Sequence, residues 1–488
     1  MDHAARPAPD RRTAAMRVTA TRKARARRAT RGASLVRCAV AMAAAAALPG
    51  ARPAWGQAPA AAGEARPARR LSFRDAVALA LAHNPQLAGA RAEARRVEGE
   101  ALRPLQGILP TLQLQETWMR SDDPSSVMAF KMKSGAFSPA DLTPAAFTAP
   151  PPPFYVYGGQ VALQVPLLNL DAWLGRGQAR SGLRAARLGV EHGEQVLTLG
   201  VLRAYFAIPL TAERIAAVRE AETVAARAVA QAEALERQRM VAPMDVLLAR
   251  SRLAAMRAEL AGALADSVHA AAALEQVLGE PVGAAGAADP LPDSVAVPAI
   301  DEALAGLASR GDVAAREEAL AAARLGVRRA RAGWLPRLNG FATLDLYDRR
   351  AFGGNRSYLT TGVALSWTPF DGMHLLAEGR TARAARARAE AERDATLLEA
   401  RTEVRTAHAR HEAARLARAH AQEACDLARQ ARAIGETRYR NSLSSMTELL
   451  AAQAAESAAA TRLSAARYEF VVTAGAYRLA AGLHVMEE

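Results

Sequence analysis

The stretch VALQVPLLNLDAWLGRGQAR, residues 161–180, recurs later in the chain as VALSWTPFDGMHLLAEGRTAR, residues 363–383. Each copy reads as an alternating strand, a proline and the start of a long helix. The pairs Leu109-Pro110 and Leu335-Pro336 lie 226 residues apart and precede a further alternating stretch in each half. The sequence of 488 residues therefore predicts a duplicated supersecondary unit rather than a short solenoid repeat.

Each half has the same predicted order of short helices, two strands and two very long helices. The first repeat is predicted at 71–280, with strands in 106–168 and long helices in 170–278. The second is predicted at 300–483, with strands in 334–369 and long helices in 371–483. Linkers are predicted at 57–70 and 281–299. The prolines predicted to mark the turns between strands and helices are Pro110, Pro166, Pro336 and Pro369.

Residues 1–56 have the features of a secretory signal peptide. An Arg-rich start is followed by the apolar run Cys38–Leu48, and the small residues Ala54 and Gly56 precede a cut before Gln57. This segment holds twelve Arg and Lys against two Asp and Glu, so it accounts for most of the net charge of +14. The remaining +4 is spread thinly along the chain, and we predict no nucleic-acid partner.

After the signal peptide, the sequence contains no apolar stretch of 18 or more residues, so we expect no transmembrane helix. An exported chain of this kind belongs in the periplasm, outside the cell, or in the outer membrane as a β-barrel. Cys425 is the one cysteine after the signal peptide, so no internal disulfide is predicted.

The predicted strands alternate between apolar and polar residues. The side chains predicted to face a water-filled lumen are Gln113, Gln115, Gln160 and Gln164, and those predicted to face lipid include Leu112, Leu114, Val161 and Leu163. Alternation over about ten residues is a weak signature of membrane strands, because a half-buried soluble sheet has the same period. Of the 23 aromatic residues, 14 lie in 106–170 or 334–370, which favours aromatic girdles at membrane interfaces.

Four strands cannot close a barrel, since outer-membrane barrels need at least ~8 strands and open edges are not tolerated in lipid. Counting alone permits a dimer with eight strands or a trimer with twelve. The long helices, at ~100 Å each, require packing on one another as coiled coils. The segments Ser121–Phe154 and Asp348–Ser357 are predicted to be loops that lie outside the cell or over the barrel mouth.

In its order of elements, the chain resembles the TolC-like outer membrane efflux proteins over about residues 71–483. The resemblance rests on the opening stretch LSFRDAVALALAHNPQL (71–87), the Leu-Pro strand entries, the turns VALQVPLLN and SWTPFDG, and the long helices. It implies a homotrimer in the outer membrane, with a twelve-stranded barrel continuous with an antiparallel helical tunnel. It also implies a passive exit duct with a periplasmic adaptor and an inner-membrane transporter as partners, and no cofactor.

The periplasmic tip of this family has the pattern Arg-Tyr-x-x-Gly-x-x-Ser-x-x-Asp-Val-Leu. The second copy, RYRNSLSSMTELL, matches at Arg438, Tyr439 and Ser445, and Ser442 replaces the Gly while Glu448 replaces the Asp. The first copy, LERQRMVAPMDVL, retains Asp245 but loses the Gly. The resemblance implies acidic rings at a periplasmic gate from Asp245 and Glu448. Its implied adaptor contacts are Arg239, Met240, Arg438, Tyr439, Ser442 and Ser445.

No catalytic motif is recognised in the sequence, and we predict neither an enzyme nor a metal site. His408 and His411 share a helix face beside Glu412, but a polar role between helices is favoured over metal binding. The alternative functions are a periplasmic coiled-coil adaptor or structural protein, and a secreted binding module that uses the Phe-rich loop. An adaptor would carry a lipoyl-like β-domain and one hairpin instead of two copies of a strand pair.

Overall fold

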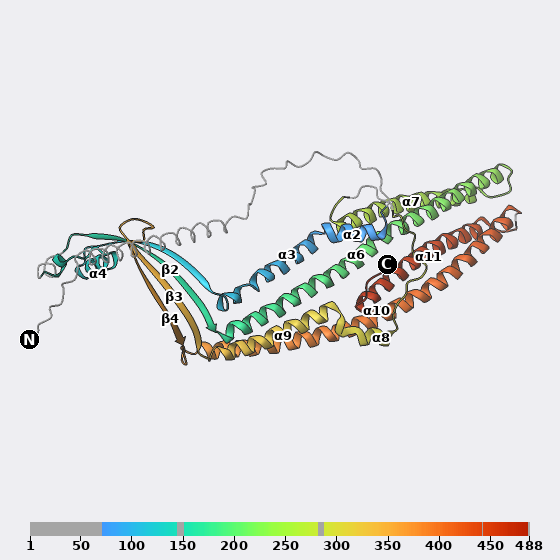
Figure 1. Cartoon of the computed structure of the whole chain (residues 1–488). Coiled ribbons are helices and arrows are strands. Elements are labelled where there is room, and N and C mark those ends of the chain that lie inside the picture. The colour runs from blue at the N-terminus through green and yellow to red at the C-terminus, as the bar shows by residue number, and fades with distance from the viewer. Residues whose placement is uncertain (1–70, 144–150, 282–286, 442, 487–488) are drawn as a thin grey trace, which may run out of the picture. The chain divides into compact units, whose positions relative to one another are not determined.

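The four alternating stretches form one antiparallel sheet in the computed structural model, which describes residues 71–143, 151–281, 287–441 and 443–486 (Figure 1). Its strands are β1 (Thr111–Ser121), β2 (Phe154–Leu168), β3 (Arg337–Asp348) and β4 (Arg356–Ser366). They lie in the order β1-β2-β3-β4, so the β2–β3 pair joins the two halves of the chain. Within the described residues, β1 and β4 are the open edges of this sheet. The predicted four-stranded, mostly helical fold is confirmed.

Two units are distinguished in the chain. The strand unit comprises the described residues of 103–174 and 329–376, and the helical unit comprises those of 61–102, 175–328 and 377–488. The predicted signal peptide and the linker 57–70 lie outside the described residues. Both units contain segments from both predicted repeats, so the repeat boundaries are not the boundaries of the units.

The segment after β1 is a helix followed by a short 3-10 turn, α4 (Pro124–Ser134) and η2 (Pro139–Leu142). The prediction of a loop throughout this stretch is wrong for these residues. The Asp123 side chain accepts a hydrogen bond from the Ser126 amide (2.7 Å), and Gly135 ends the helix with φ 74°. An N-cap, a proline at the first helical position and a glycine after the last are the standard helix signals, so the sequence contained the information.

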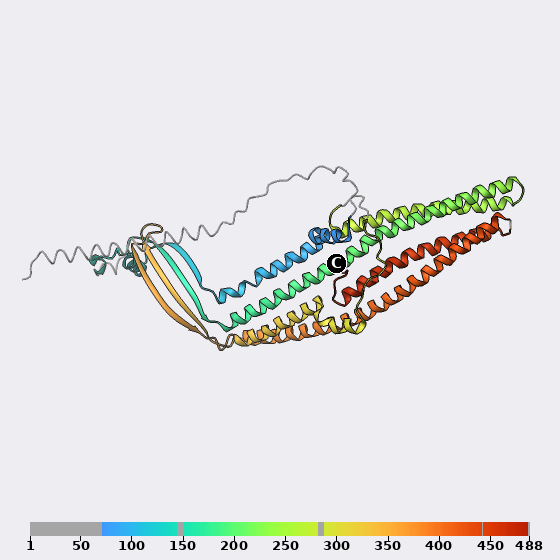
Figure 2. The ribbon, with the colours of Figure 1, turned by 45° about the vertical axis from the view of Figure 1, so that its right-hand side comes forward.

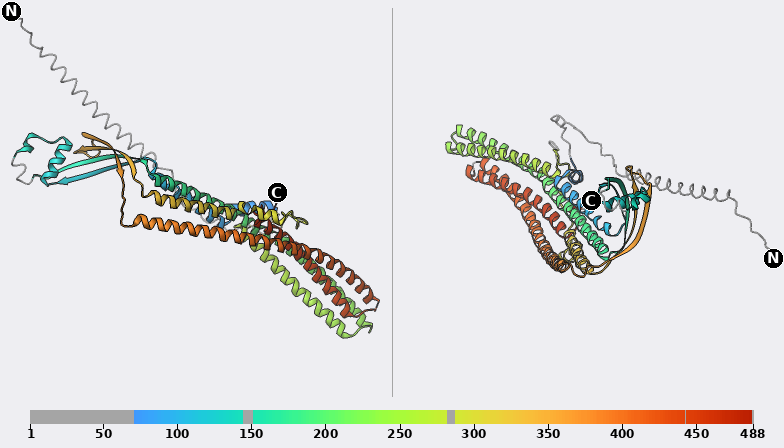
Figure 3. Two further views of the ribbon diagram at one scale, coloured as in Figure 1. Left: turned by 90° about the horizontal axis from the view of Figure 1, so that it is seen from below. Right: turned by 90° about the vertical axis from the view of Figure 1, so that its left-hand side faces the viewer.

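The helical unit is built from long antiparallel pairs. Its elements are α2 (Phe73–His83), α3 (Pro85–Glu100), α6 (Leu170–Arg237), α7 (Pro243–Leu278), α8 (Ile300–Ala305), η3 (Gly306–Ser309), α9 (Gly311–Ala332), α10 (His374–Arg440) and α11 (Met446–Ala480). Helix α6 pairs with α7, and α10 with α11 (Figures 2 and 3). Small buried side chains such as Ala228, Ala232 and Ala249 allow the helices to approach closely.

In each half of the chain, the residue between two short helical elements is hydrogen-bonded to the C-terminal end of a long helix. We call this arrangement the joint. In the first half, Asn84 lies between α2 and α3, and its side-chain amide donates to the Val277 carbonyl of α7 (2.9 Å). Its carboxamide oxygen accepts from the Gln86 and Leu87 amides and so caps α3. Gly279 follows α7 with φ 82°, and a Cβ there would lie 2.5 Å from the His83 carbonyl oxygen.

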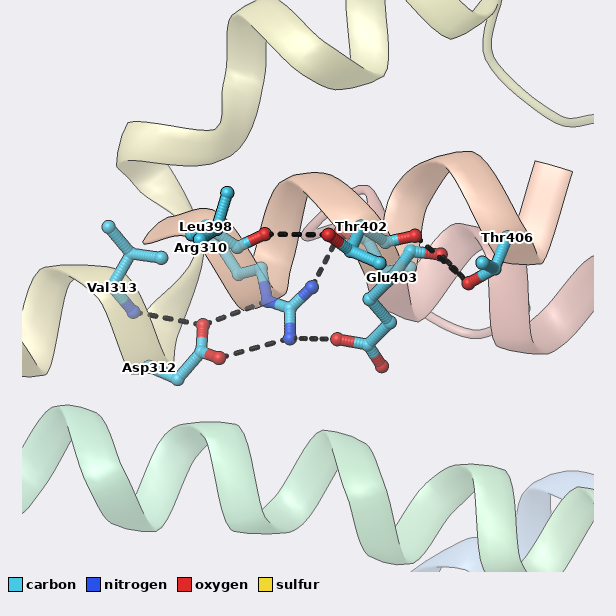
Figure 4. Close-up of polar contacts among 8 residues, drawn as sticks. Arg310, Asp312, Val313, Leu398, Thr402, Glu403 and Thr406 are labelled. Atoms are coloured by element: carbon cyan, nitrogen blue, oxygen red, sulfur yellow. Dashed lines mark hydrogen bonds and ion pairs between the residues drawn. The ribbon is translucent and has the colours of Figure 1, made fainter. Parts of the chain in front are cut away.

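The second half repeats this joint with different chemistry (Figure 4). Arg310, between η3 and α9, is almost fully buried and donates to the Ala480 carbonyl of α11 (3.1 Å). Its guanidinium also pairs with Asp312 (2.8 Å) and with Glu403 of α10. Gly482 follows α11 with φ 78° and lies against Arg310. The burial of this charge is offset by two carboxylates and a carbonyl.

The largest buried cluster of the helical unit surrounds the middle of α6. Tyr205 is fully buried, contacts the rings of Phe73 and Phe206, and its hydroxyl is hydrogen-bonded to the Leu71 carbonyl (2.7 Å) and to Asp289 (2.9 Å). Among the described residues, α6 contains an 18-residue window long and apolar enough to cross a membrane by length and composition. The apolar character of α6 is accounted for by this core.

The joint predicts unequal effects of two glycine substitutions in or next to α7. Gly279→Ala is expected to lower the free energy of unfolding by about 2–3 kcal/mol, because a left-handed residue gains a Cβ against the backbone of His83. Gly262→Ala is the matched control, since a Cβ there meets nothing within 4 Å, and it should stabilise α7 by about 0.5–1 kcal/mol. Urea titrations followed by helical circular dichroism measure both. Equal changes in the free energy of unfolding for the two variants would contradict the close contact between Gly279 and His83.

Candidate functional site

The register of the sheet places the four predicted lumen-facing glutamines on one face. Gln115 lies opposite Gln160, while Gln113 pairs with Ala162 and Gln164 with Thr111. The Gln160 side-chain amide donates to the Asp345 carboxylate on β3 (2.9 Å). The polar residues of both repeats therefore form one continuous polar face.

The other face of the same strands is apolar and exposed. Leu112 lies opposite Leu163, Val161 lies between Leu114 and Leu344, and Leu344 lies opposite Leu359. Leu112 is 61% exposed and Leu359 is 70% exposed. A face of this kind in a soluble sheet would be covered by other elements, so its exposure in the chain indicates contact with lipid.

Aromatic side chains gather at both ends of this sheet. Trp118 lies opposite Tyr157 near the end of β1 that precedes α4. At the other end, the exposed Trp367 donates its indole N–H to the Trp334 carbonyl (3.1 Å), and Phe370 is exposed nearby in the chain. Two aromatic zones separated by an aliphatic band are typical of strands that span a membrane.

The prolines occupy the strand ends, with one exception. Pro110 and Pro336 directly precede β1 and β3, and Pro369 lies between β4 and α10. Pro166, predicted to lie in a turn, is instead inside β2, where the register with β3 shifts between Pro166 and Leu168. The bulge accommodates the missing backbone donor of the proline.

The tips of the two helical hairpins pack against each other in a small apolar cluster. Tyr439 and Met446 of the second hairpin contact Val246 and Ala249 of the first. Tyr439 is only 4% exposed, so its predicted role as an adaptor contact is corrected: the ring fills the core between the hairpins. Burial, together with the nearby Asp245 carboxylate, raises the pKa of Tyr439.

Both predicted gate acids occupy the first turn of the helix that follows the tip. Asp245 is the third residue of α7 and Glu448 the third residue of α11. Ser445 is the N-cap of α11, and its hydroxyl accepts a hydrogen bond from the Glu448 amide (3.2 Å). The carboxylates therefore stabilise the helix N-termini, and the exposed Glu448 also faces solvent at the tip.

The turn of the first hairpin shows what the glycine of the family pattern provides. Arg239 stands at that glycine position and has φ 59°, a left-handed conformation that costs a non-glycine residue about 1–2 kcal/mol. Ser442, at the same position of the second hairpin, lies outside the described residues. Arg438 donates to the Leu443 carbonyl (3.3 Å) and so closes the second turn.

The hairpin tips also carry an exposed apolar surface that was not predicted from the sequence. Met244 and Leu247 of α7 and Leu443 of the second turn are exposed, as is the predicted contact residue Met240. The spacing of these residues in α7 could have predicted this surface. Val246 and Ala249, three residues apart, face the buried cluster, whereas Met244 and Leu247, also three apart, lie on the exposed side of the helix. We call Met240, Met244, Leu247 and Leu443 the apolar tip surface.

The histidine pair of α10 lies between helices. His411 is buried against the Phe470 ring (5.1 Å between centroids), and His408 meets the edge of the Tyr477 ring (5.2 Å). Burial lowers the pKa of His411, which favours the neutral ring. Within the ranges that the structure describes, no group of three His, Cys, Asp or Glu residues is placed to hold a metal ion.

Comparisons with known proteins agree with this arrangement. Residues 302–482 match the sequence model of the family described as outer membrane efflux protein. The resemblance to the TolC-like outer membrane efflux proteins is confirmed. The fold of the chain is similar to that of the Campylobacter jejuni CmeC outer membrane channel, with 17% sequence identity and a TM-score of 0.71. The match covers 85% of this chain and 87% of CmeC, so it includes both repeats.

Two further solved structures have the same TolC-like fold. The Vibrio cholerae outer membrane protein VceC has 20% identity over 85% of this chain and 96% of its own, with a TM-score of 0.69. The open state of the Neisseria gonorrhoeae MtrE outer membrane channel has 17% identity over 85% and 89%, with a TM-score of 0.68. No curated protein sequence matches the chain.

The two faces of the TolC-like sheet predict opposite outcomes for adjacent substitutions. Leu163→Arg places a charge on the apolar face and should cost about 2–4 kcal/mol in the middle of a bilayer, whereas Gln164→Arg on the polar face should cost little. The yield of folded protein in isolated outer membranes measures both. A normal yield for Leu163→Arg with a loss for Gln164→Arg would mean that the polar face meets lipid.

Proposed function

We propose that the chain is one protomer of a trimeric outer membrane exit duct, a passive conduit in a tripartite efflux or type I secretion system. The observation that carries the proposal is the four-stranded sheet with an exposed apolar face and two open edges. In lipid, every backbone N–H and C=O must be paired, so these edges require further copies of the sheet. The apolar face then meets the membrane, and the polar face lines a water-filled lumen.

Three copies give a barrel of twelve strands. A dimer would supply eight strands, which is also enough for closure, so strand counting alone does not choose between them. The likeness to the outer membrane efflux protein family favours three. Pairing of β4 in one copy with β1 in the next is the contact that this assembly requires.

The hairpin tips are the proposed docking site for a periplasmic adaptor, which would connect the duct to an inner-membrane transporter. The apolar tip surface supports this role, because four large apolar side chains are exposed at the ends of the hairpins and a docked partner would bury them. Tyr439 and Val246 hold the two hairpins together beneath it. The transporter supplies the energy for export, and the duct supplies the path.

A periplasmic adaptor or a coiled-coil structural protein would explain the long helices equally well. Neither explains a sheet that has one polar face, one exposed leucine-rich face and an aromatic zone at each end. No described feature favours these alternatives over the duct.

The assembly is tested with detergent-solubilised protein taken from outer membranes. Sedimentation equilibrium should give three copies per particle, and the purified particle should open channels in a planar bilayer. A stable monomer that retains its β-sheet signal by circular dichroism would overturn the proposal. Recovery of the protein only from the soluble periplasmic fraction would favour the structural alternative.

The acidic residues at the tip predict a cation-selective constriction. Threefold symmetry would turn Asp245 and Glu448 into rings of three carboxylates, which favour cations and bind divalent ions. Glu448→Gln should weaken cation preference and block by divalent cations in bilayer recordings. It should leave the assembly almost unchanged, because the helix-dipole contribution of one exposed carboxylate is only about 0.3–1 kcal/mol.

The control for this prediction is Ser445→Ala, which removes the N-cap of the same helix without removing a charge. It should lower stability by about 1 kcal/mol and leave ion selectivity unchanged. Unaltered selectivity in the double variant Asp245→Asn, Glu448→Gln would show that the two acids serve only the helix termini.

A further inference from the structure

Helix α4 is a defined element of the strand unit. It lies in the connection between β1 and β2. The opposite ends of these two strands are joined to η1 and α6. Asp123 caps its first turn, and burial of Val127 (3% exposed) shows that one side of the helix is packed. The short turn η2 is fixed to it, since the Lys131 ammonium contacts the Asp141 carboxylate (2.5 Å).

The surface that α4 covers is the polar face of the sheet. Helix α4 contacts β2 and β3, and Val156 of β2 is fully buried there. Val156 lies opposite Met119, and both alternate in register with Gln160 and Gln115, so they belong to the polar face. On the apolar face, cover is limited to the end beside the β3–β4 connection, where the Phe352 amide donates to the Glu116 carboxylate (3.1 Å) and Leu346 is buried.

The C-terminal end of α4 is latched by side chains of the second repeat. The Tyr358 hydroxyl donates to the Lys133 carbonyl (3.1 Å), and the Asn355 amide donates to the Ser134 carbonyl (3.2 Å). These bonds satisfy carbonyls that have no partner inside a helix end. The Lys133 ammonium lies 5.1 Å from the centre of the Tyr347 ring and donates to its hydroxyl (3.2 Å).

Both tyrosines of this latch lie on the polar face. Tyr358 pairs with Asp345, whose carboxylate accepts the hydrogen bond from Gln160, and Tyr347 follows Asp345 by two residues on the same strand. The helix of the first repeat is therefore fixed across the polar face of a sheet that also contains β3 and β4 of the second repeat. An irregular loop outside the membrane would not require these contacts.

We propose that α4 is a constriction at the outer end of the channel, and that Lys131 and Lys133 line it and determine which solutes pass. This proposal rests on the proposed trimeric duct, in which the polar face lines the lumen. A helix packed on that face projects into the lumen cross-section, and three copies narrow the mouth from three sides.

Lysine chemistry provides a direct test, because the sequence contains only Lys23, Lys131 and Lys133, and Lys23 lies in the predicted signal peptide. Single-channel currents of the purified protein are recorded in a planar bilayer. A bulky sulfonated N-hydroxysuccinimide ester is added to the compartment on the side of the proposed outer mouth, where α4 lies. Acylation at Lys131 or Lys133 should reduce single-channel conductance by about twofold or more, because the added group occupies the narrowed mouth. Mass spectrometry identifies the acylated residues.

The matched control is the double variant Lys131→Arg, Lys133→Arg, which keeps both charges and removes both reactive amines. Its conductance should be unaffected by the reagent. Unchanged conductance of the original chain after acylation of Lys133, which is exposed, would overturn the proposal.

A second pair of variants tests the latch without chemical labelling. Asn355→Ala with Tyr358→Phe removes both side-chain donors to α4 and should raise the single-channel conductance, whereas Ser357→Ala, between them on the apolar face, should not. Equal conductance in all three proteins would also overturn the constriction. Failure of the original chain to form trimers or channels would contradict the proposed duct instead, so the two proposals are distinguished.

Discussion

The open edges of the four-stranded sheet are the constraint on which the rest of the arrangement depends. β1 and β4 each present a row of backbone donors and acceptors beside an exposed apolar face. Water can satisfy those groups at a soluble edge, but hydrocarbon cannot. The exposed leucines and the unpaired edges therefore cannot be explained separately. In the proposed duct, neighbouring copies of the same sheet pair these edges, so the assembled particle, rather than the single chain, would be the folded unit in the membrane.

The two halves of the chain contain the same joint, made by different side chains. Each half must hold a break between helices against the end of a long helix. Asn84 does so with a neutral amide, and Arg310 does so with a buried guanidinium neutralised by Asp312 and Glu403. A left-handed glycine, Gly279 or Gly482, lies against each break residue. The backbone geometry is retained between the halves, while the polar group that satisfies it changes, because each side chain reaches the carbonyl two residues before that glycine, Val277 or Ala480.

At the tips, the same residues serve structure and the proposed function at once. Asp245 and Glu448 occupy helix N-termini, where a negative charge is favourable in any assembly. Threefold symmetry would place three copies of each around one axis and give these ordinary capping positions a collective effect on passing ions. Tyr439 contributes in the opposite way, since its burial removes it from the partner surface and makes it part of the support beneath that surface.

The sequence by itself determined the duplication, the four strands, their two faces and the long helices. These features are carried by periods of two and 3.6 residues and by prolines at strand ends, which are local signals. It also contained the signals of α4 in Asp123, Pro124 and Gly135, although the abundance of Pro and Ser in the segment suggested a loop. Only the tertiary structure decided that α4 packs on the polar face, that Tyr439 is buried between hairpins, and that Pro166 lies in a bulge. Each of these depends on contacts between segments far apart in the chain, such as Tyr358 with Lys133, and no local pattern specifies which side of a sheet a connecting helix will cover.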